Sequence, residues 1–252
     1  MFASYLKFFK SISSKIFLFS KIFEQTPGNL AFVSVIGPKN SGKSSLLDKL
    51  LKTREFQGNH VSEGVWLHKT PIFIENQGLY VYFLEFEGYE EYETSSVFEE
   101  KLIILAMALS SAIMLLNGRD YEENHEKFFS LLSFFDENVS NFNENCMKLP
   151  HLFSVLRGNT WNSGLGRSKI LNFTDKYDYH AINLGNTVVN SLRNQAESFN
   201  FEESELLMQK LLNKSLKKEI LGVSLTGTLF SKVITSIIER LNLNLVLDFQ
   251  EM

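Results

Sequence analysis

The chain reads Gly37-Pro38-Lys39-Asn40-Ser41-Gly42-Lys43-Ser44 at residues 37–44. These eight residues match G-x-x-x-x-G-K-[ST], the pattern of the P-loop. The apolar run at residues 31–36 before them predicts a buried parallel strand, and leucines at helical spacing after them predict a helix. A strand, a glycine-bearing turn and a helix N-terminus together form an anion site, so the pattern predicts phosphate binding.

The motif assigns roles to individual residues of this loop. Gly37 and Gly42 let the backbone wrap closely around an anion, with amide hydrogens pointing at phosphate oxygens. Lys43 would reach the β- and γ-phosphates, and the Ser44 hydroxyl would ligate Mg²⁺. The alternative is a glycine turn followed by a surface lysine. We predict that the residues that hold the phosphates are Gly37, Asn40, Ser41, Gly42, Lys43, Ser44 and Ser45.

The composition narrows the class of protein. A length of 252 residues suits one α/β domain, and 44% hydrophobic residues suffice for a large core. The net charge of −4 provides no bulk attraction to nucleic acid. A single cysteine, Cys146, excludes an internal disulfide and fits a reducing compartment, so we expect a cytoplasmic location. The longest apolar run, residues 102–116, is too short for a membrane span and predicts a helix that runs into a buried strand.

The N-terminal segment has its own pattern. Residues 1–23 contain four lysines and no acidic side chain, and their apolar residues recur near the helical period. We predict a basic amphipathic helix at residues 1–24, followed by a single domain at residues 25–252. Three alternatives are open for this helix: peripheral contact with an anionic membrane surface, targeting to an organelle, and docking on the domain, which we favour.

The remaining sequence alternates strand and helix patterns. This alternation predicts a three-layer α/β fold with a mostly parallel central sheet and helices on both faces. The predicted strands are residues 65–74 and 79–86, paired as a hairpin, and then 112–116, 151–156, 180–184 and 243–249. The predicted helices are residues 99–108, 121–135, 205–221 and 229–241.

An acidic residue lies near the end of the second hairpin strand. Glu85 is followed three residues later by Gly88. In a nucleotide switch, a carboxylate at this place holds Mg²⁺ through water and the glycine amide contacts the γ-phosphate. Such a pair has little meaning alone, but here it follows a P-loop by about forty residues at the end of a strand.

Several stretches resemble the large GTPase domain of guanylate-binding proteins, which are close relatives of the atlastins. Residues 62–66, Ser-Glu-Gly-Val-Trp, resemble the family's switch I signature T-x-G-I-W. Residues 84–88, Leu-Glu-Phe-Glu-Gly, resemble its switch II, L-D-T-E/Q-G, and residues 108–112 resemble its L-L-S-S-T/A run. Thr226-Gly227 resembles the end of the family's domain. The similarity extends over residues 28–241 and is specific in the first 90 of these.

The resemblance implies a P-loop GTPase-type fold, GTP and Mg²⁺ as ligands, GTP hydrolysis and a nucleotide-dependent homodimer. Carried over residue by residue, it makes Lys43, Ser62 and Gly88 catalytic. It gives Mg²⁺ to Ser44, Ser62 and Glu85, and it places Arg157 beside the base.

Two departures from the family pattern leave three functions open. Asn40 replaces an arginine finger that contributes about 10³–10⁵ in rate. Gly158 replaces the aspartate that reads guanine, and glycine cannot accept those hydrogen bonds. The chain is therefore a slow GTPase, a degenerate GTPase that binds nucleotide without turnover, or an adenine-nucleotide P-loop protein.

Overall fold

The structure is a computed structural model of the whole chain. It describes residues 23–53, 64–68, 71–89, 97–116, 127, 128, 130, 135, 147–156, 179–183, 201–214 and 216–243. The predicted N-terminal helix before Phe23, most of the predicted helix at 121–135, and the strand at 243–249 beyond Leu243 lie outside these residues. Ser62, Arg157 and Gly158 lie outside them as well.

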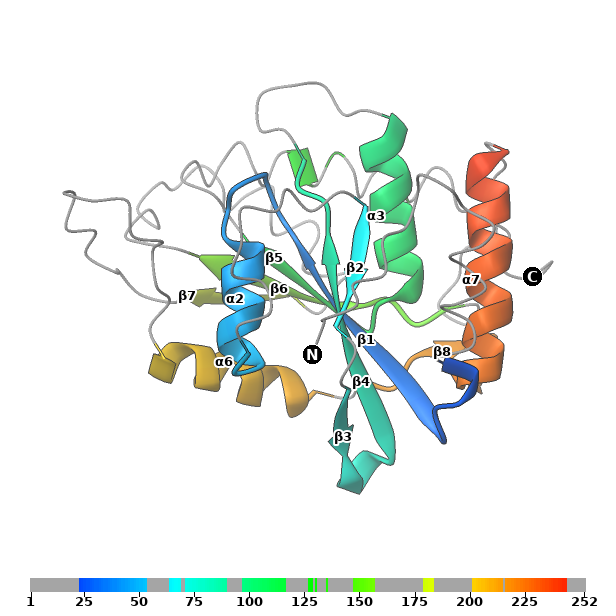
Figure 1. Cartoon of the computed structure of the whole chain (residues 1–252), viewed down its shortest axis with the longest axis horizontal. Helices are drawn as coiled ribbons and strands as arrows, with labels where there is room; N and C mark the ends of the chain where they lie inside the picture. The colour runs from blue at the N-terminus through cyan, green and yellow to red at the C-terminus, as the bar shows by residue number, and fades with distance from the viewer. Residues whose placement is uncertain are drawn as a thin grey trace.

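A central sheet organises the chain (Figure 1). Its strands run in the order β2-β4-β1-β5-β6-β7, and β3 also pairs with β4. The strands β4, β1, β5, β6 and β7 are parallel, whereas β2 and β3 are antiparallel to β4. The strands of this sheet are β1 (Asn29–Ile36), β2 (Val65–Leu67), β3 (Ile72–Ile74), β4 (Leu79–Phe86), β5 (Ala112–Leu116), β6 (His151–Leu156) and β7 (Tyr179–Asn183).

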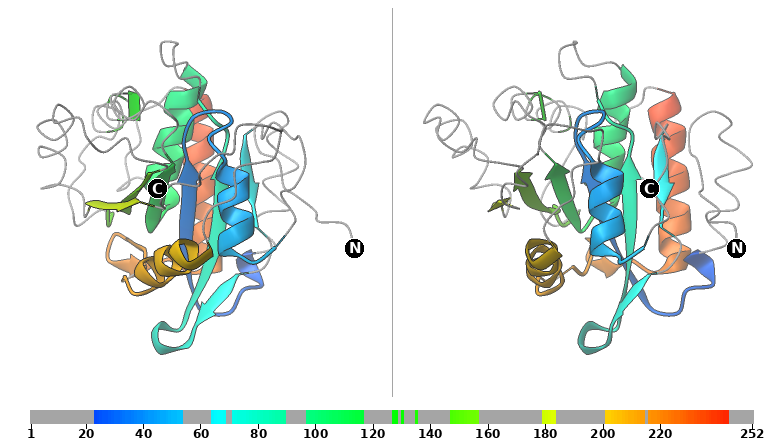
Figure 2. Two further views of the ribbon diagram at one scale, coloured as in Figure 1. Left: turned by 90° about the vertical axis from the view of Figure 1, so that its left-hand side faces the viewer. Right: turned by 60° about the vertical axis from the view of Figure 1, so that its left-hand side comes forward.

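Helices cover both faces of the sheet, as Figure 2 shows. On one face α2 (Lys43–Leu50) packs against α6 (Phe201–Leu212), and on the other α3 (Val97–Leu109) packs against α7 (Gly227–Asn242). Parallel strands need crossover connections, and helices that cross over must lie on the faces. The predicted three-layer α/β fold with a mostly parallel sheet is confirmed.

The central strand β1 shows how the sequence builds two cores. Leu30 and Phe32 belong to the core under α3 and α7, whereas Val33 and Val35 belong to the core under α2 and α6. All four are fully buried, because side chains alternate between the two covered faces of a strand. A continuous apolar run is therefore what a central parallel strand requires.

An aromatic cluster joins the start of the described chain to the core. The Phe23 ring lies 4.6 Å from that of Phe230 and 4.8 Å from that of Tyr82, both edge-on. Gly227 begins α7 beneath Phe23, and a Cβ there would overlap the Phe23 carbonyl. Phe23, near the end of the predicted N-terminal helix, is thus packed on the domain, and the docking of residues 1–22 stays a prediction.

The prediction of one helix over residues 205–221 is wrong in its second half. The helix α6 ends at Leu212, and residues 219–224 form a hairpin of β8 (Glu219–Ile220) and β9 (Val223–Ser224). Leu221 and Gly222, with φ of 52° and 72°, make its two-residue turn. Positive φ at both residues of a two-residue turn gives the turn a twist that matches the twist of the two strands. Glycine, here Gly222, adopts a positive φ without strain.

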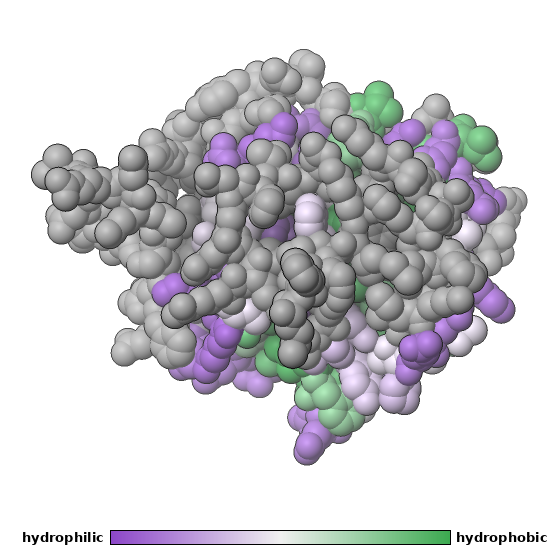
Figure 3. Space-filling view, viewed as in Figure 1, coloured by the Kyte–Doolittle hydropathy of each residue, from purple (hydrophilic) through white to green (hydrophobic). Residues whose placement is uncertain are grey.

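The predicted hairpin strand at 65–74 is divided in two. The segments β2 and β3 both pair with β4, on either side of residues 68–71. Pro71 has no N–H to give to the ladder, which accounts for the break. Figure 3 shows hydrophobic surface at the end of the molecule where Figure 1 places the β3–β4 hairpin. Phe73 of β3 is 48% exposed there and lies 4.6 Å from the Tyr80 ring.

The apolar run at residues 102–116 divides into the end of α3 and the strand β5, as predicted. In the part of the chain that the structure describes, no helix is both long and apolar enough to cross a membrane.

Candidate phosphate-binding site

The loop at residues 37–44 lies at the carboxyl end of β1, where it turns into α2. Gly37 follows β1 directly and passes so close to β5 that a Cβ would overlap the Leu116 carbonyl. Gly42 precedes α2 with φ of 89°, and Asn40 has φ of 60°. Glycine and asparagine tolerate this left-handed region better than other residues. The sequence therefore folds here into a tight turn that leads into a helix N-terminus, which favours anions.

The Lys43 side chain lies inside this loop. Only 6% of the residue is exposed, and its Nζ donates to the Pro38 carbonyl at 2.8 Å and to the Gly37 carbonyl at 3.2 Å. Burial lowers the pKa of Lys43 to about 8, opposed by the negative charges of Glu85 and Glu87. An ammonium has three donors, so the two carbonyls leave one for a ligand. A bound anion would favour the charged form and raise this pKa again.

Ser44 and Glu85 meet at the start of α2. The Ser44 hydroxyl donates to Glu85 Oε1 at 2.7 Å, although the residues are 41 positions apart. Glu85 is only 2% exposed, and it lies in β4 opposite Val35 of the central strand. The structure thus brings together two of the three predicted Mg²⁺ ligands, and the third, Ser62, lies outside the described residues.

The segment after β4 lies directly on the loop. The Lys39 amide donates to the Tyr89 carbonyl at 2.9 Å, and Pro38 and Tyr89 form a parallel β-bridge. A Cβ at Gly88 would come within 2.6 Å of Lys39 N and 2.7 Å of Lys43 Nζ. No larger residue fits at position 88 without moving the backbone. The sequence marked this glycine by its spacing from Glu85, and the structure explains it by close approach.

Glu87 ties the two predicted switch regions together, a contact that sequence reasoning missed. The Gly64 amide donates to Glu87 Oε2 at 2.5 Å, and the Glu87 amide donates to the Gly64 carbonyl at 2.7 Å. The only signal in the sequence was that Glu87 matches the acidic position of the switch II pattern. The pairing places Gly64, two residues after Ser62, beside the end of β4.

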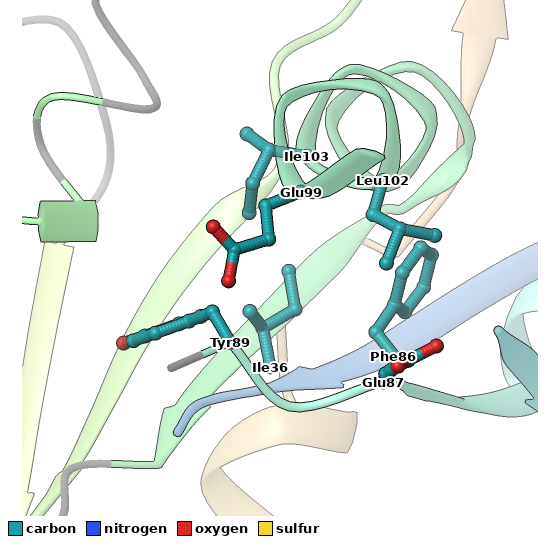
Figure 4. Close-up of a pocket in the computed structure, with 7 residues that line it drawn as sticks. All are labelled: Ile36, Phe86, Glu87, Tyr89, Glu99, Leu102 and Ile103. Carbon is teal, nitrogen blue, oxygen red and sulfur yellow. The ribbon is translucent and has the colours of Figure 1, made fainter. Parts of the chain in front are cut away.

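A small hollow of about 10 Å³, room for little more than one water molecule, lies behind this segment, between β1 and α3 (Figure 4). The Glu99 carboxylate of α3 points toward the Tyr89 ring in this view. Lys127 Nζ lies 3.3 Å from Glu99 Oε2 and 5.4 Å from the centre of the Tyr89 ring. The residues that line the hollow are Ile36, Phe86, Glu87, Tyr89, Glu99, Leu102 and Ile103.

The other predicted loop residues lie where the motif places them. Ser41 is 5% exposed, with its amide donating to the Pro38 carbonyl at 3.3 Å, and Ser45 lies in the first turn of α2. Among the described residues, no group of three or more His, Cys, Asp or Glu side chains could hold a metal. Ser44 and Glu85 supply only two oxygen ligands, which suits Mg²⁺ because that ion keeps waters and takes phosphate oxygens as ligands.

Comparisons with known proteins give structural likenesses at low sequence identity. No protein-family model and no curated protein matches the chain. One similar solved structure is the bacterial selenocysteine-specific elongation factor EF-Sec, with a TM-score of 0.42 and 13% identity over 74% of this chain and 29% of that one. Another is Methanosarcina barkeri Roco2 RocCORdC bound to GDP, with a TM-score of 0.48 and 19% identity over 85% of this chain and 58% of that one.

Both similar proteins are longer, since the chain spans 29% and 58% of their lengths. The class of protein is therefore defined by the fold and the loop themselves. A central parallel strand that leads into a glycine turn, a buried lysine and a helix N-terminus makes this chain a P-loop protein with a three-layer α/β fold.

Proposed function

We propose that this chain binds GTP with Mg²⁺ at residues 37–45 and hydrolyses it slowly, as a divergent protein of the guanylate-binding and atlastin type. The observation that carries the proposal is the position of Lys43. Its ammonium is held inside the loop by the Gly37 and Pro38 carbonyls, at the N-terminus of α2. A surface lysine after a glycine turn would point into solvent instead, and helix N-terminal amides together with a held ammonium favour a polyphosphate.

The pair of Ser44 and Glu85 fits Mg²⁺. A hydroxyl and a carboxylate are hard oxygen ligands, and their 2.7 Å hydrogen bond holds both oxygens at one place beside the loop. Glu85 is buried and accepts the hydrogen bond of the Ser44 hydroxyl. Bound Mg²⁺ would neutralise charge on the phosphate oxygens. The chain's own part is to orient the two ligands and, through Lys43, to hold the phosphates.

Slow turnover follows from Asn40. The residue occupies the loop position of the family's arginine finger, and its amide carries no charge to place on the transferring phosphate. A finger contributes about 10³–10⁵ in rate, so we expect hydrolysis slower by that order. The same observation favours a second candidate function, in which the chain binds GTP as a switch without turnover.

The preference for guanine rests on the resemblance alone. Arg157 would flank the base, while Gly158 offers no side-chain acceptor to guanine. An adenine-nucleotide protein is therefore the third candidate.

Titration of labelled GTP, GDP and ATP against the purified chain with Mg²⁺ tests all three. We expect GTP to bind more tightly than ATP, and Lys43→Ala to weaken binding and abolish turnover. Failure of every nucleotide to bind below about millimolar would refute nucleotide binding altogether. Binding without measurable turnover would favour the switch, and tighter ATP than GTP binding would favour the adenine-nucleotide protein.

We also propose two partners for this chain, a second copy of itself and an anionic membrane surface. A homodimer across the nucleotide face is tested by light scattering with GDP and with a non-hydrolysable GTP analogue. A cytoplasmic chain with peripheral membrane contact through residues 1–23 is tested by sedimentation with anionic liposomes, with and without those residues. Equal sedimentation of both forms would leave docking of this helix on the domain as its role.

A further inference from the structure

The β3–β4 hairpin presents two aromatic side chains beyond the start of α7. Phe73 of β3 lies opposite Tyr80 of β4, and their ring centres are 4.6 Å apart. Phe73 is 48% exposed, and Tyr80 is partly buried. In Figure 1 and Figure 2 the hairpin projects past the first turn of α7. These two side chains, here called the aromatic ledge, therefore form an apolar surface at the edge of the core.

The aromatic ledge continues a row of rings that begins at Phe23. Tyr80 and Tyr82 point to the same face of β4, since side chains alternate along a strand. The Tyr82 ring lies 4.8 Å from the Phe23 ring. The exposed fraction rises along this row, from 0% at Phe23 and 3% at Tyr82 to 48% at Phe73. The apolar surface therefore runs outward from the place where residues 1–22 join the domain.

Residues 1–22 are long enough to cover the aromatic ledge. Two residues of a strand span about 7 Å, so the Phe73 ring lies about 16 Å from the Phe23 ring along the row. A helix rises about 1.5 Å per residue, so about eleven residues before Phe23 suffice to reach it. In this span of the predicted helix, Ile12, Ile16 and Phe19 share the apolar face.

The charges around the aromatic ledge favour this segment over a membrane. Residues 1–22 carry four lysines and no acidic side chain. Two acidic residues beside the ledge are exposed, Glu24 directly after Phe23 and Glu75 two positions after Phe73. An anionic membrane surface would repel these carboxylates, whereas a basic segment is attracted to them.

We propose that residues 12–22 dock on the aromatic ledge through Ile12, Ile16 and Phe19. A membrane would take up the same apolar face of the segment. Contact with a membrane therefore requires release from the ledge, and the ledge acts as an intramolecular cover for the segment. This inference does not depend on nucleotide binding.

Amide hydrogen exchange of the full chain, measured by mass spectrometry without lipid, tests the docking. Residues 12–22 should exchange slowly in the wild-type chain. In Phe73→Asp they should exchange about ten- to a hundredfold faster, the factor expected when an aromatic contact surface is lost. In Glu75→Lys they should exchange about two- to fivefold faster, as the loss of attraction between exposed charges predicts.

Val223→Asp is the matched control. Val223 is also an exposed apolar residue of a two-stranded hairpin, at 57%, but it lies in β9 and outside the row of rings. Its replacement should leave the exchange of residues 12–22 unchanged. Thermal unfolding checks that each variant is folded. If Phe73→Asp does not fold, Glu75→Lys decides, because its exposed position lies in the turn between β3 and β4.

Fast exchange of residues 12–22 in the wild-type chain would overturn the docking, and so would equal exchange in wild type and Phe73→Asp. Sedimentation with vesicles of phosphatidylcholine and phosphatidylserine tests the membrane as the other occupant. Release from the ledge predicts more vesicle-bound chain for Phe73→Asp than for wild type. Less vesicle-bound chain would mean that the ledge itself enters the membrane, which would overturn the proposal.

Discussion

Replacing Gly88 by alanine tests the contact on which the site depends. Gly88 does not have a positive φ, so its backbone conformation is open to alanine. The added Cβ would lie 2.6 Å from Lys39 N, 2.7 Å from Lys39 Cα and 2.7 Å from Lys43 Nζ. Two of these atoms belong to the backbone, and the third is held by two carbonyls. The substitution therefore isolates close approach as the cause of any effect.

The expected loss of stability follows from this crowding. Inserting a methyl group into a packed site costs about 1–3 kcal/mol. For a domain of this size, each kcal/mol lowers the thermal midpoint by about 2–4 °C. Differential scanning calorimetry of Gly88→Ala without nucleotide should therefore show a midpoint about 2–12 °C below wild type.

Gly78→Ala is a control in which backbone strain, and not crowding by neighbouring atoms, lowers the stability. A Cβ at Gly78 meets nothing within 4 Å, but the residue has φ of 58°. Its expected cost is about 1 kcal/mol of backbone strain, with no effect on nucleotide affinity. Gly88→Ala should in addition weaken GTP binding, because the displaced backbone crowds Lys43. A Gly88→Ala chain with wild-type midpoint and wild-type GTP affinity would refute the packing of residues 87–89 on the loop.

Three further predictions concern the metal, the turnover and the pH dependence. Ser44→Ala should remove most of the effect of Mg²⁺ on nucleotide affinity, measured with Mg²⁺ and with EDTA; an unchanged Mg²⁺ effect would contradict its role as ligand. Asn40→Arg should raise GTP turnover at least about tenfold, in the direction of an arginine finger, as followed by phosphate release; no increase would argue against a missing finger. Burial lowers the pKa of Lys218 to about 7, so unfolding takes up a proton above that pH. The unfolding free energy should rise by up to about 1.4 kcal/mol per pH unit between pH 7 and 10. Urea unfolding should show a smaller slope for Lys218→Met, and an equal slope would contradict the lowered pKa of Lys218.

The parts of the fold that could be predicted are those with local causes. The apolar run of β1 indicates a strand covered on both faces, and the spacing of Gly37, Gly42 and Lys43 indicates the turn into α2. These features depend on residues close together in the chain. The change from helix to strand within residues 102–116 was also predictable, because the run was too short for a membrane span.

The contacts that complete the site join distant residues, and no local pattern indicates them. Glu87 reaches back 23 positions to Gly64, and Tyr89 packs beneath Lys127. A lysine in a polar stretch ordinarily predicts a solvated side chain, so the sequence does not indicate the ion pair of Lys127 with Glu99. Only the packing of α3 against residues 87–89 brings these two side chains together beside Tyr89.

Lys218 shows the same limit in the region where the helix prediction was wrong. Its side chain is 1% exposed and donates to the Ser110 carbonyl at 2.9 Å and to the Lys148 carbonyl at 2.8 Å. A third acceptor, the Met107 carbonyl at 3.4 Å, lies near the end of α3. A cation at a helix C-terminus satisfies carbonyls that have no partner within the helix. Helical periodicity in residues 205–221 cannot indicate these contacts, because the Met107 and Ser110 carbonyls lie about 110 positions earlier in the chain than Lys218.

The backbone conformation of the loop explains why asparagine suits position 40. Its φ of 60° lies in the left-handed region, where asparagine is among the best tolerated residues after glycine. An arginine at this position would bear about 1 kcal/mol of strain in the same loop conformation. Asn40→Arg should therefore gain turnover while lowering the thermal midpoint by about 2–4 °C.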